Sequence, residues 1–156
     1  VHAPPRVDQL SSRLLALFLF SPAQAEEIIS TTMPEMLKPV EQQDLYAKLV
    51  ACYTAYNSQG SPSGGADFRQ FWRTCPAMAG PDILSTSDIL ELLGDKEFDG
   101  WSAKDLQREV KFICAELRRD FTTQRRNELA IQMKQAEKEG NRARMEELTR
   151  EFHLLE

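Results

Sequence analysis

The chain has 156 residues, of which 42% are hydrophobic and 28% are charged, and its formal net charge is −5. This size and composition are typical of one globular domain with a buried core, with or without a small appendage. The acidic balance excludes the basic excess that an autonomous nucleic-acid-binding protein needs, so we expect no direct nucleic-acid binding. The longest apolar run, residues 14–20, is too short to cross a membrane.

Residues 1–7 are predicted to be a linker or leader, because two prolines stand among them and the first residue is not methionine. We therefore interpret the chain as a piece of a larger protein. Asp8 is the expected N-cap of a first helix that runs to about Phe20. This helix is nearly apolar all round over residues 14–20, which predicts that it is the central helix of a bundle.

Several shorter helices are predicted to follow the first one. In order, the pattern indicates a short helix from Pro22 to about Ser30, a helix over 41–57, a glycine-rich loop over 59–65, a helix over 66–79 shortened by Pro76, a helix over 81–93 closed by Gly94, and an acidic loop over 95–100. No segment shows sustained period-two alternation, so no strand is expected. The fold class predicted is all-α.

The last third of the chain predicts a long helix and a shorter one. Ser102 is the expected N-cap, and no proline or glycine follows until Gly140, which allows a helix of roughly 38 residues. Gly140 and Asn141 suit the end of one helix and the start of the next. The chain is therefore predicted to be a multi-helix bundle followed by a long-helix C-terminal hairpin.

The apolar stripe of the long helix stops at residues 122–128, which are all polar, and then resumes. This break suggests that the two halves of the helix pack on different partners. We expect a bundle subdomain over residues 8–121 and a hairpin subdomain over residues 122–156. The candidate hinge between them consists of Thr122, Thr123, Gln124 and Arg125.

A two-helix hairpin of this size cannot cover both of its apolar stripes, so part of that apolar surface should be exposed and mark an interaction site. The candidate binding residues are Leu129, Ile131, Met133, Met145, Leu148, Phe152 and Leu155. Two alternatives stay open. The hairpin could fold back on the bundle, or a second copy of the chain could cover the same surface.

No motif indicates catalysis, a metal site or a cofactor. The two histidines, His2 and His153, have no partner at metal-ligand spacing, and neither a phosphate-binding loop nor a nucleophile elbow occurs. The acidic residues over 95–99 lack the spaced glutamate of a calcium loop. The three cysteines are widely spaced and odd in number, which favours free thiols and a cytoplasmic location.

The end of the chain resembles the C-terminal, helicase-binding domain of bacterial DNA primase. The resemblance lies in FICAELRR at 112–119, ELAIQ at 128–132, AEKEGN at 136–141 and MEELTREF at 145–152, with weaker support from RLLALFL at 13–19 and the Ser21-Pro22 pair. It covers about residues 10–156. It implies a bundle with a C-terminal hairpin that docks on the N-terminal domains of the hexameric replicative helicase and so recruits primer synthesis to the replication fork.

The resemblance also implies what this chain does not do. The parent protein would be a DNA-dependent RNA polymerase that makes primers, but its zinc-binding and polymerase regions are not in this sequence, so no catalytic residue is expected here. Family members also bind the acidic tail of single-stranded-DNA-binding protein through a basic pocket near the first helix. That helix begins without a lysine here, and Arg13 is the only cation close by, which argues against that role.

Two other functions remain as alternatives. The chain could be the N-terminal oligomerisation domain of a replicative helicase, which is also a helical bundle with a hairpin and would self-associate. It could also be an unrelated helical adaptor, or a helical enzyme or ligand-binding bundle, which would need a buried polar pocket that the sequence does not show.

Overall fold

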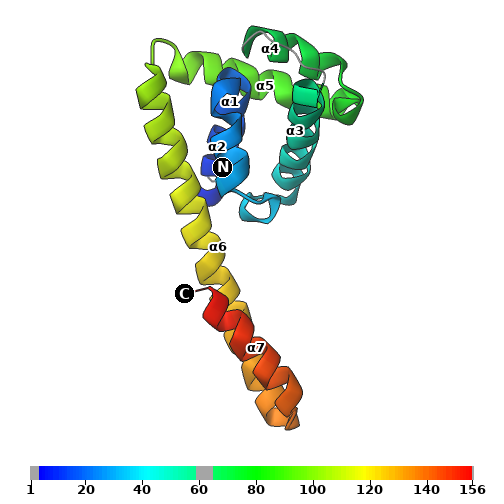
Figure 1. Cartoon of the computed structure of the whole chain (residues 1–156), viewed down its shortest axis with the longest axis vertical. Helices are drawn as coiled ribbons and strands as arrows, with labels where there is room; N and C mark the ends of the chain where they lie inside the picture. Colours follow the sequence, from blue (N-terminus) through cyan, green and yellow to red (C-terminus); the bar gives the residue numbers. More distant parts are fainter. Residues whose placement is uncertain (1–3, 59–64, 156) are drawn as a thin grey trace. The chain divides into compact units, whose positions relative to one another are not determined.

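The computed structural model describes residues 4–58 and 65–155, and side chains are described for all of these except residues 65–67. Within these residues the secondary structure is entirely helical, which confirms the all-α class (Figure 1). Residues 59–64 of the expected glycine-rich loop, and residues 1–3 of the expected leader, lie outside the described part.

The helices follow the order predicted from the sequence, with some changes at their ends. They are α1 (Arg6–Phe20), α2 (Ala25–Thr31), α3 (Val40–Ser58), α4 (Gly65–Thr74), α5 (Pro81–Phe98), α6 (Ala103–Glu139) and α7 (Arg142–Leu154), with short 3-10 turns η1 (Pro22–Gln24), η2 (Pro34–Met36) and η3 (Pro76–Met78). Asp8 is not the N-cap of α1. Pro5 occupies that position, and its carbonyl accepts the first helical hydrogen bond from the Gln9 N–H at 3.1 Å.

The chain divides into two compact units, Val1–Leu117 and Arg118–Glu156, and α6 contributes to both. The subdomain boundary predicted after residue 121 falls inside the second unit and stays a prediction. We describe each unit by itself.

The first unit is built around α1, whose second half is covered on all sides. Every side chain from Leu14 to Leu19 is fully buried. Phe18 contacts Tyr46 and Tyr53 of α3 and Phe68 of α4 in edge or tilted ring arrangements, with centroid separations between 5.9 and 6.4 Å. Such ring pairs add to the hydrophobic burial that holds helices together. The prediction that this helix is the central one is therefore confirmed.

The beginning of α6 covers α1 from another side (Figure 1). Its expected apolar stripe is buried at Leu106, Val110, Ile113 and Leu117. The expected cap is also present, because the Ser102 hydroxyl accepts a hydrogen bond from the Asp105 N–H at 3.1 Å. Arg13 of α1 adds a polar contact by donating from Nε to Glu109 of α6 at 2.7 Å.

Gly94 does not close α5, as the sequence suggested, but lies inside it. The helix continues to Phe98, so most of the expected acidic loop is helical. A Cβ atom on Gly94 would lie 2.9 Å from the carbonyl oxygen of Ala16 and 3.1 Å from Cβ of Phe20, both on α1. The glycine is therefore retained inside a helix because it lets α5 approach the backbone of α1 closely.

Replacing Gly94 with alanine tests this packing, because helix propensity predicts a more stable variant and packing predicts a less stable one. Alanine is the better helix former by about 1 kcal/mol. The clash with the Ala16 carbonyl should outweigh this gain and leave the Gly94→Ala variant less stable by about 1–3 kcal/mol in a denaturant titration. Ser85→Ala, at an exposed position of the same helix, is the control and should be neutral or stabilising. A Gly94→Ala variant as stable as the wild type would contradict the close approach.

All three cysteines are free thiols and all are buried in the first unit. Burial, followed by a hydrogen bond with the Cys75 thiol, raises the pKa of Cys52 well above the ordinary thiol value. Burial also raises the pKa of Tyr46, whose hydroxyl donates to the Thr32 carbonyl at 2.8 Å. The folded state therefore favours the neutral form of both groups.

The raised pKa of Cys52 in the folded state predicts that the free energy of unfolding falls in alkaline solution. Below about pH 8.5 Cys52 is protonated in both the folded and the unfolded protein. Above this pH the thiol loses its proton more readily in the unfolded chain, which lowers the free energy of the unfolded state relative to the folded one. Between pH 8 and pH 10 the free energy of unfolding should fall by about 1–2 kcal/mol more in the wild type than in a Cys52→Ala variant. Urea titrations at several pH values measure this difference. Parallel curves for the two proteins would contradict the raised pKa.

A candidate protein-interaction surface in the C-terminal unit

The C-terminal unit consists of the end of α6 and the whole of α7, joined by a tight turn. Gly140 has φ +65°, a left-handed conformation that glycine adopts readily. The Asn141 N–H donates to the Ala136 carbonyl at 3.0 Å, and the Asn141 side chain accepts from the Arg144 N–H at 3.1 Å. The turn therefore ends one helix and caps the next, as the sequence predicted.

The two helices of this unit contact each other through a small apolar core. Leu129 and Ala136 of α6 and Leu148 of α7 are its buried members. Met133, Met145, Phe152 and Leu155 pack around them and are only half-buried. Three buried side chains are few for a folding unit, so little apolar burial holds this pair of helices together.

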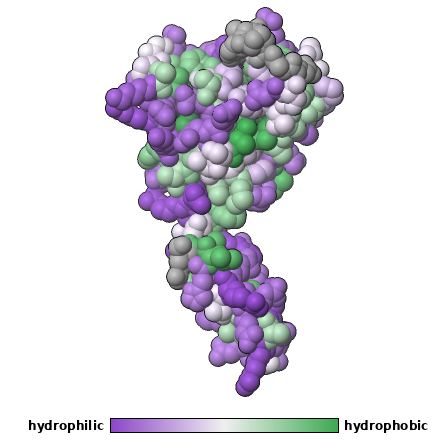
Figure 2. Space-filling view, viewed as in Figure 1, coloured by the Kyte–Doolittle hydropathy of each residue, from purple (hydrophilic) through white to green (hydrophobic). Residues whose placement is uncertain are grey.

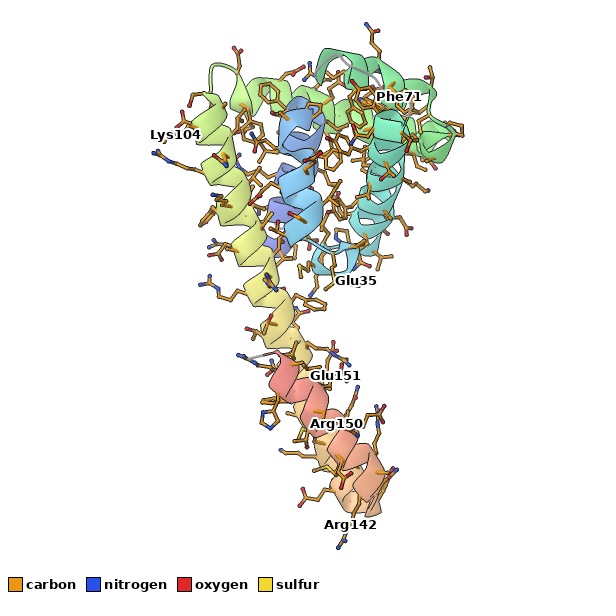
Figure 3. The ribbon with its side chains drawn as sticks, in the orientation of Figure 1. Glu35, Phe71, Lys104, Arg142, Arg150 and Glu151 are labelled. Atoms are coloured by element: carbon orange, nitrogen blue, oxygen red, sulfur yellow. The ribbon has the colours of Figure 1, made fainter. Side chains whose placement is uncertain are left out.

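Ion pairs along the side of the two helices supplement the small core. Arg125 of α6 donates to Glu151 of α7, through Nε at 3.0 Å and also through Nη2, and its Nη1 contacts Glu128 at 3.1 Å. Figure 3 labels Glu151 on α7, and Arg142 and Arg150 on the same helix. The hydrogen bond with Glu151, and then that with Glu128, raises the pKa of Arg125 above its ordinary value.

A second arginine ties the end of α7 to α6. Arg126 donates from Nη2 to the backbone carbonyl of Leu155 at 3.0 Å. Further along, Arg144 of α7 donates to the Gln132 side chain of α6 at 3.3 Å and pairs with Glu147 at 3.0 Å. Arg125, Arg126 and Arg144 thus link the two helices, and surface ion pairs such as that between Arg125 and Glu151 contribute up to about 1 kcal/mol each.

The structure separates the seven predicted binding residues into three groups. Ile131 is exposed, with 69% of its surface accessible, and Met133, Met145, Phe152 and Leu155 are half-buried. Leu129 and Leu148 are fully buried. The expectation that Leu129 is exposed is therefore wrong, because the two apolar stripes face each other. Neither Leu129 nor Leu148 presents a surface to a partner in this arrangement.

A large exposed apolar residue of this unit was not among the predicted binding residues. Leu154, near the end of α7, is 84% exposed. It stands two positions after Phe152, which places it about 200° around the helix from the stripe that faces α6. Ile131 stands in the same relation to Leu129 on α6. Leu154 could have been predicted to be exposed from the sequence, because it is an apolar residue two positions after a residue of the buried stripe.

The surface of the unit is otherwise mainly hydrophilic. On the face shown in Figure 2, hydrophobic atoms gather near the end of α7 and charged or polar atoms cover most of the rest. An apolar group surrounded by polar residues is a common arrangement at sites where another protein binds.

The candidate hinge, Thr122, Thr123, Gln124 and Arg125, lies within α6, which is helical from Ala103 to Glu139. Arg125 also belongs to the ion-pair group described above. The role of these four residues as a hinge stays a prediction.

Other kinds of site find no support in the described residues. No group of three or more His, Cys, Asp or Glu residues there could hold a metal ion. The acidic residues over 95–99 are instead mostly helical, and Asp95 pairs with Arg69 at 2.5 Å. None of the described helices has an apolar stretch long enough to cross a membrane.

Comparisons with protein-family models, with curated proteins and with solved structures find no match to the chain. The resemblance to the primase domain therefore depends on the sequence patterns described above.

The division of the unit into buried and exposed residues predicts unequal effects for two leucines on α7. Leu148→Ala should destabilise the C-terminal unit by roughly 2–5 kcal/mol, because it leaves a cavity in a core of three buried residues. Hydrogen exchange should then show lost amide protection over 118–155 and unchanged protection in α1. Leu154→Ala, at an exposed position, is the matched control and should change little. Equal effects of the two substitutions would contradict the assigned packing.

Proposed function

We propose that this chain is a non-catalytic interaction domain of a bacterial DNA primase, and that its C-terminal unit binds the N-terminal domains of the hexameric replicative helicase. The domain would bring primer synthesis to the replication fork by tethering, which raises the local concentration of the primase without any chemistry of its own. Helix-on-helix packing would make the contact.

The observation that carries this proposal is the combination of a small core and exposed apolar side chains in residues 118–155. Among the described residues 118–155, only Leu129, Ala136 and Leu148 are buried, while Ile131 and Leu154 are exposed. Units below about 40 residues usually need a further source of stability. A partner that covers the outward side chains would supply it, because binding to the folded form shifts the folding equilibrium.

The resemblance in the sequence supports the choice of partner. Its most specific segments, at 128–132, 136–141 and 145–152, all lie in this unit, and the primase family uses that region to bind the helicase. Two arguments of different origin, one from the sequence pattern and one from side-chain exposure, thus point to the same unit.

Light scattering coupled to size-exclusion chromatography tests the proposal directly. The chain alone should elute as a monomer, and with the cognate hexameric helicase it should move into the hexamer peak. A discrete oligomer that ignores the helicase would refute the proposal and favour the self-associating helicase N-terminal domain.

A pair of matched variants tests which surface binds. Ile131→Asp places a charge on the outward face of α6 and should weaken helicase binding about tenfold or more, because a desolvated charge would enter an apolar contact. Ile89→Asp, on α5 of the first unit, has a closely similar exposure, 64% against 69%, and should bind as the wild type does. Isothermal titration calorimetry measures both affinities.

The choice of Ile131 rather than Leu148 keeps folding and binding apart. Because Leu148 is fully buried, a charge there would unfold the unit and abolish binding for an indirect reason. Equal affinities of Ile131→Asp and the wild type would contradict a contact through the outer face of α6.

A further inference from the structure

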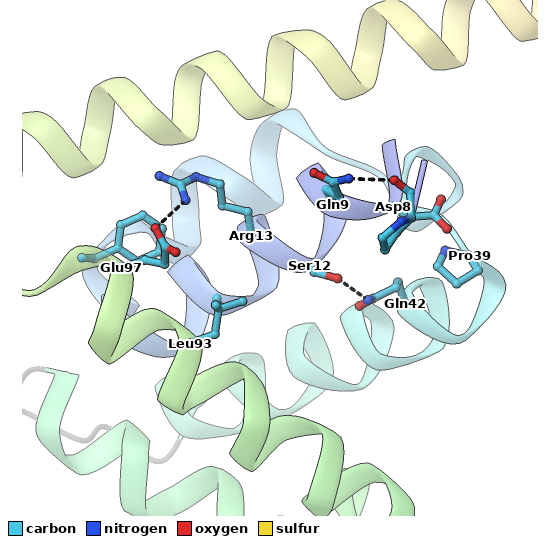
Figure 4. Close-up of a pocket in the computed structure, with 11 residues that line it drawn as sticks. Asp8, Gln9, Ser12, Arg13, Pro39, Gln42, Leu93 and Glu97 are labelled. Atoms are coloured by element: carbon cyan, nitrogen blue, oxygen red, sulfur yellow. Dashed lines mark hydrogen bonds and ion pairs between the residues drawn. The ribbon is translucent and has the colours of Figure 1, made fainter. Parts of the chain in front are cut away.

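A cavity of about 530 Å³ opens in the first unit between α1, the start of α3 and the end of α5 (Figure 4). This volume lies within the range of roughly 300–1,000 Å³ that is usual for small-ligand sites. Figure 4 shows Asp8 and Pro39 toward one side of the cavity and Arg13 and Glu97 toward the other. The proposed helicase contact uses none of these residues.

Arg13, the only cation among the described residues that line the cavity, is already engaged. Its Nε donates to Glu109 at 2.7 Å and its Nη1 to Glu97 at 3.3 Å. Its guanidinium also lies over the ring of Phe98, 4.7 Å from the centroid. Cation–π contact and two carboxylates together hold this group in place. An anion that approached Arg13 would meet the negative charges of these two carboxylates.

The carboxylates that line the cavity have fewer partners than Arg13 has. Asp8 makes no ion pair among the described residues, and Glu97 is partly exposed beside Arg13. Among the described residues that line the cavity, Asp8 and Glu97 are carboxylates and Arg13 is a cation, so the lining carries a net formal charge of −1. An excess of negative charge in a cavity attracts cationic ligands.

Two backbone and side-chain dipoles add to this negative potential. The side-chain oxygen of Gln42 is buried in the wall without a hydrogen-bond partner among the described residues, while its amide nitrogen donates to Ser12 at 2.7 Å. Glu97 and Phe98 are the last residues of α5, and the carboxyl end of a helix carries partial negative charge.

Apolar residues make up much of the remaining wall, beside the polar side chains of Gln9 and Ser12. Ala16, Pro39, Leu93 and Phe98 line the cavity between the carboxylates, and an alkyl chain can pack on such a surface while its charged end stays with the acceptors. The site thus combines a short apolar surface with acceptors of negative charge.

We propose that this cavity binds a primary ammonium group carried on an alkyl stem, the chemistry shared by a lysine side chain and a free polyamine. The stem packs on Leu93 and Pro39, and the ammonium group donates hydrogen bonds to Asp8 or Glu97. The inference goes beyond the proposed helicase contact and is independent of it.

NMR titration of the full chain with n-butylammonium chloride tests the site. Amide shifts should change over α1, the start of α3 and the end of α5, and n-butanol, which has the same stem without the charge, should leave these amides unshifted at the same concentration. Shifts spread evenly over the chain, or equal shifts with butanol, would overturn the proposal.

Variants separate the cavity from general charge attraction. Asp8→Asn with Glu97→Gln should weaken binding by about fivefold or more, because each exposed charge pair contributes up to about 1 kcal/mol. Glu35→Gln with Glu137→Gln makes the same change in net charge at exposed positions outside the cavity and should leave the affinity unchanged. Equal weakening by both pairs would overturn the proposal. Asp8→Asn alone serves as a second test that leaves the Arg13–Glu97 pair intact.

Two further titrations distinguish the sources of the ammonium group. Nα-acetyl-lysine amide represents a side chain of a partner protein, and spermidine represents a free polyamine. Tighter binding of the first assigns the cavity to a protein segment, and tighter binding of the second assigns it to a polyamine. Binding of neither would overturn the inference.

Discussion

The burial of α1 is the constraint on which the rest of the first unit depends. Its side chains from Leu14 to Leu19 are fully buried, and a helix that is apolar all round is stable in water only when other elements cover every side. The other helices of the unit therefore have to surround it. Gly94 shows how close that cover is, because a side chain there would meet the backbone of Ala16. The cavity lies at the edge of α1, beside the start of α3 and the end of α5.

The parts of the fold that could be predicted from the sequence are those set by local chemistry. Ser102 and Gly140 mark helix ends because a hydroxyl cap and a left-handed residue are local needs, and both predictions are confirmed. The role of Gly94 could not be predicted in this way, because glycine is required there by the backbone of α1, which is distant in the sequence. Leu129 was expected to be exposed but is buried. The apolar stripe on one helix does not show which neighbouring helix covers it. The cavity was missed because its lining comes from three separate segments.

The two units differ in what stabilises them, and this difference supports the division of roles. The first unit has a large core of aromatic and aliphatic side chains and would fold on hydrophobic burial. The C-terminal unit has three buried side chains and relies also on the pairs that Arg125 makes with Glu151 and Glu128. An element with little stability of its own can gain much from a partner. The unit with the smaller core is also where the primase-like pattern is most specific.

The most direct test of this account is hydrogen–deuterium exchange of the chain, measured with and without the cognate hexameric helicase. The account predicts that the helicase slows exchange of the amides in residues 118–155, where the core is small and Ile131 is exposed. Amides of α1, which are already protected by burial, should not change. Slower exchange confined to the first unit, or no change anywhere in the chain, would contradict the central claim that the C-terminal pair of helices is the binding element.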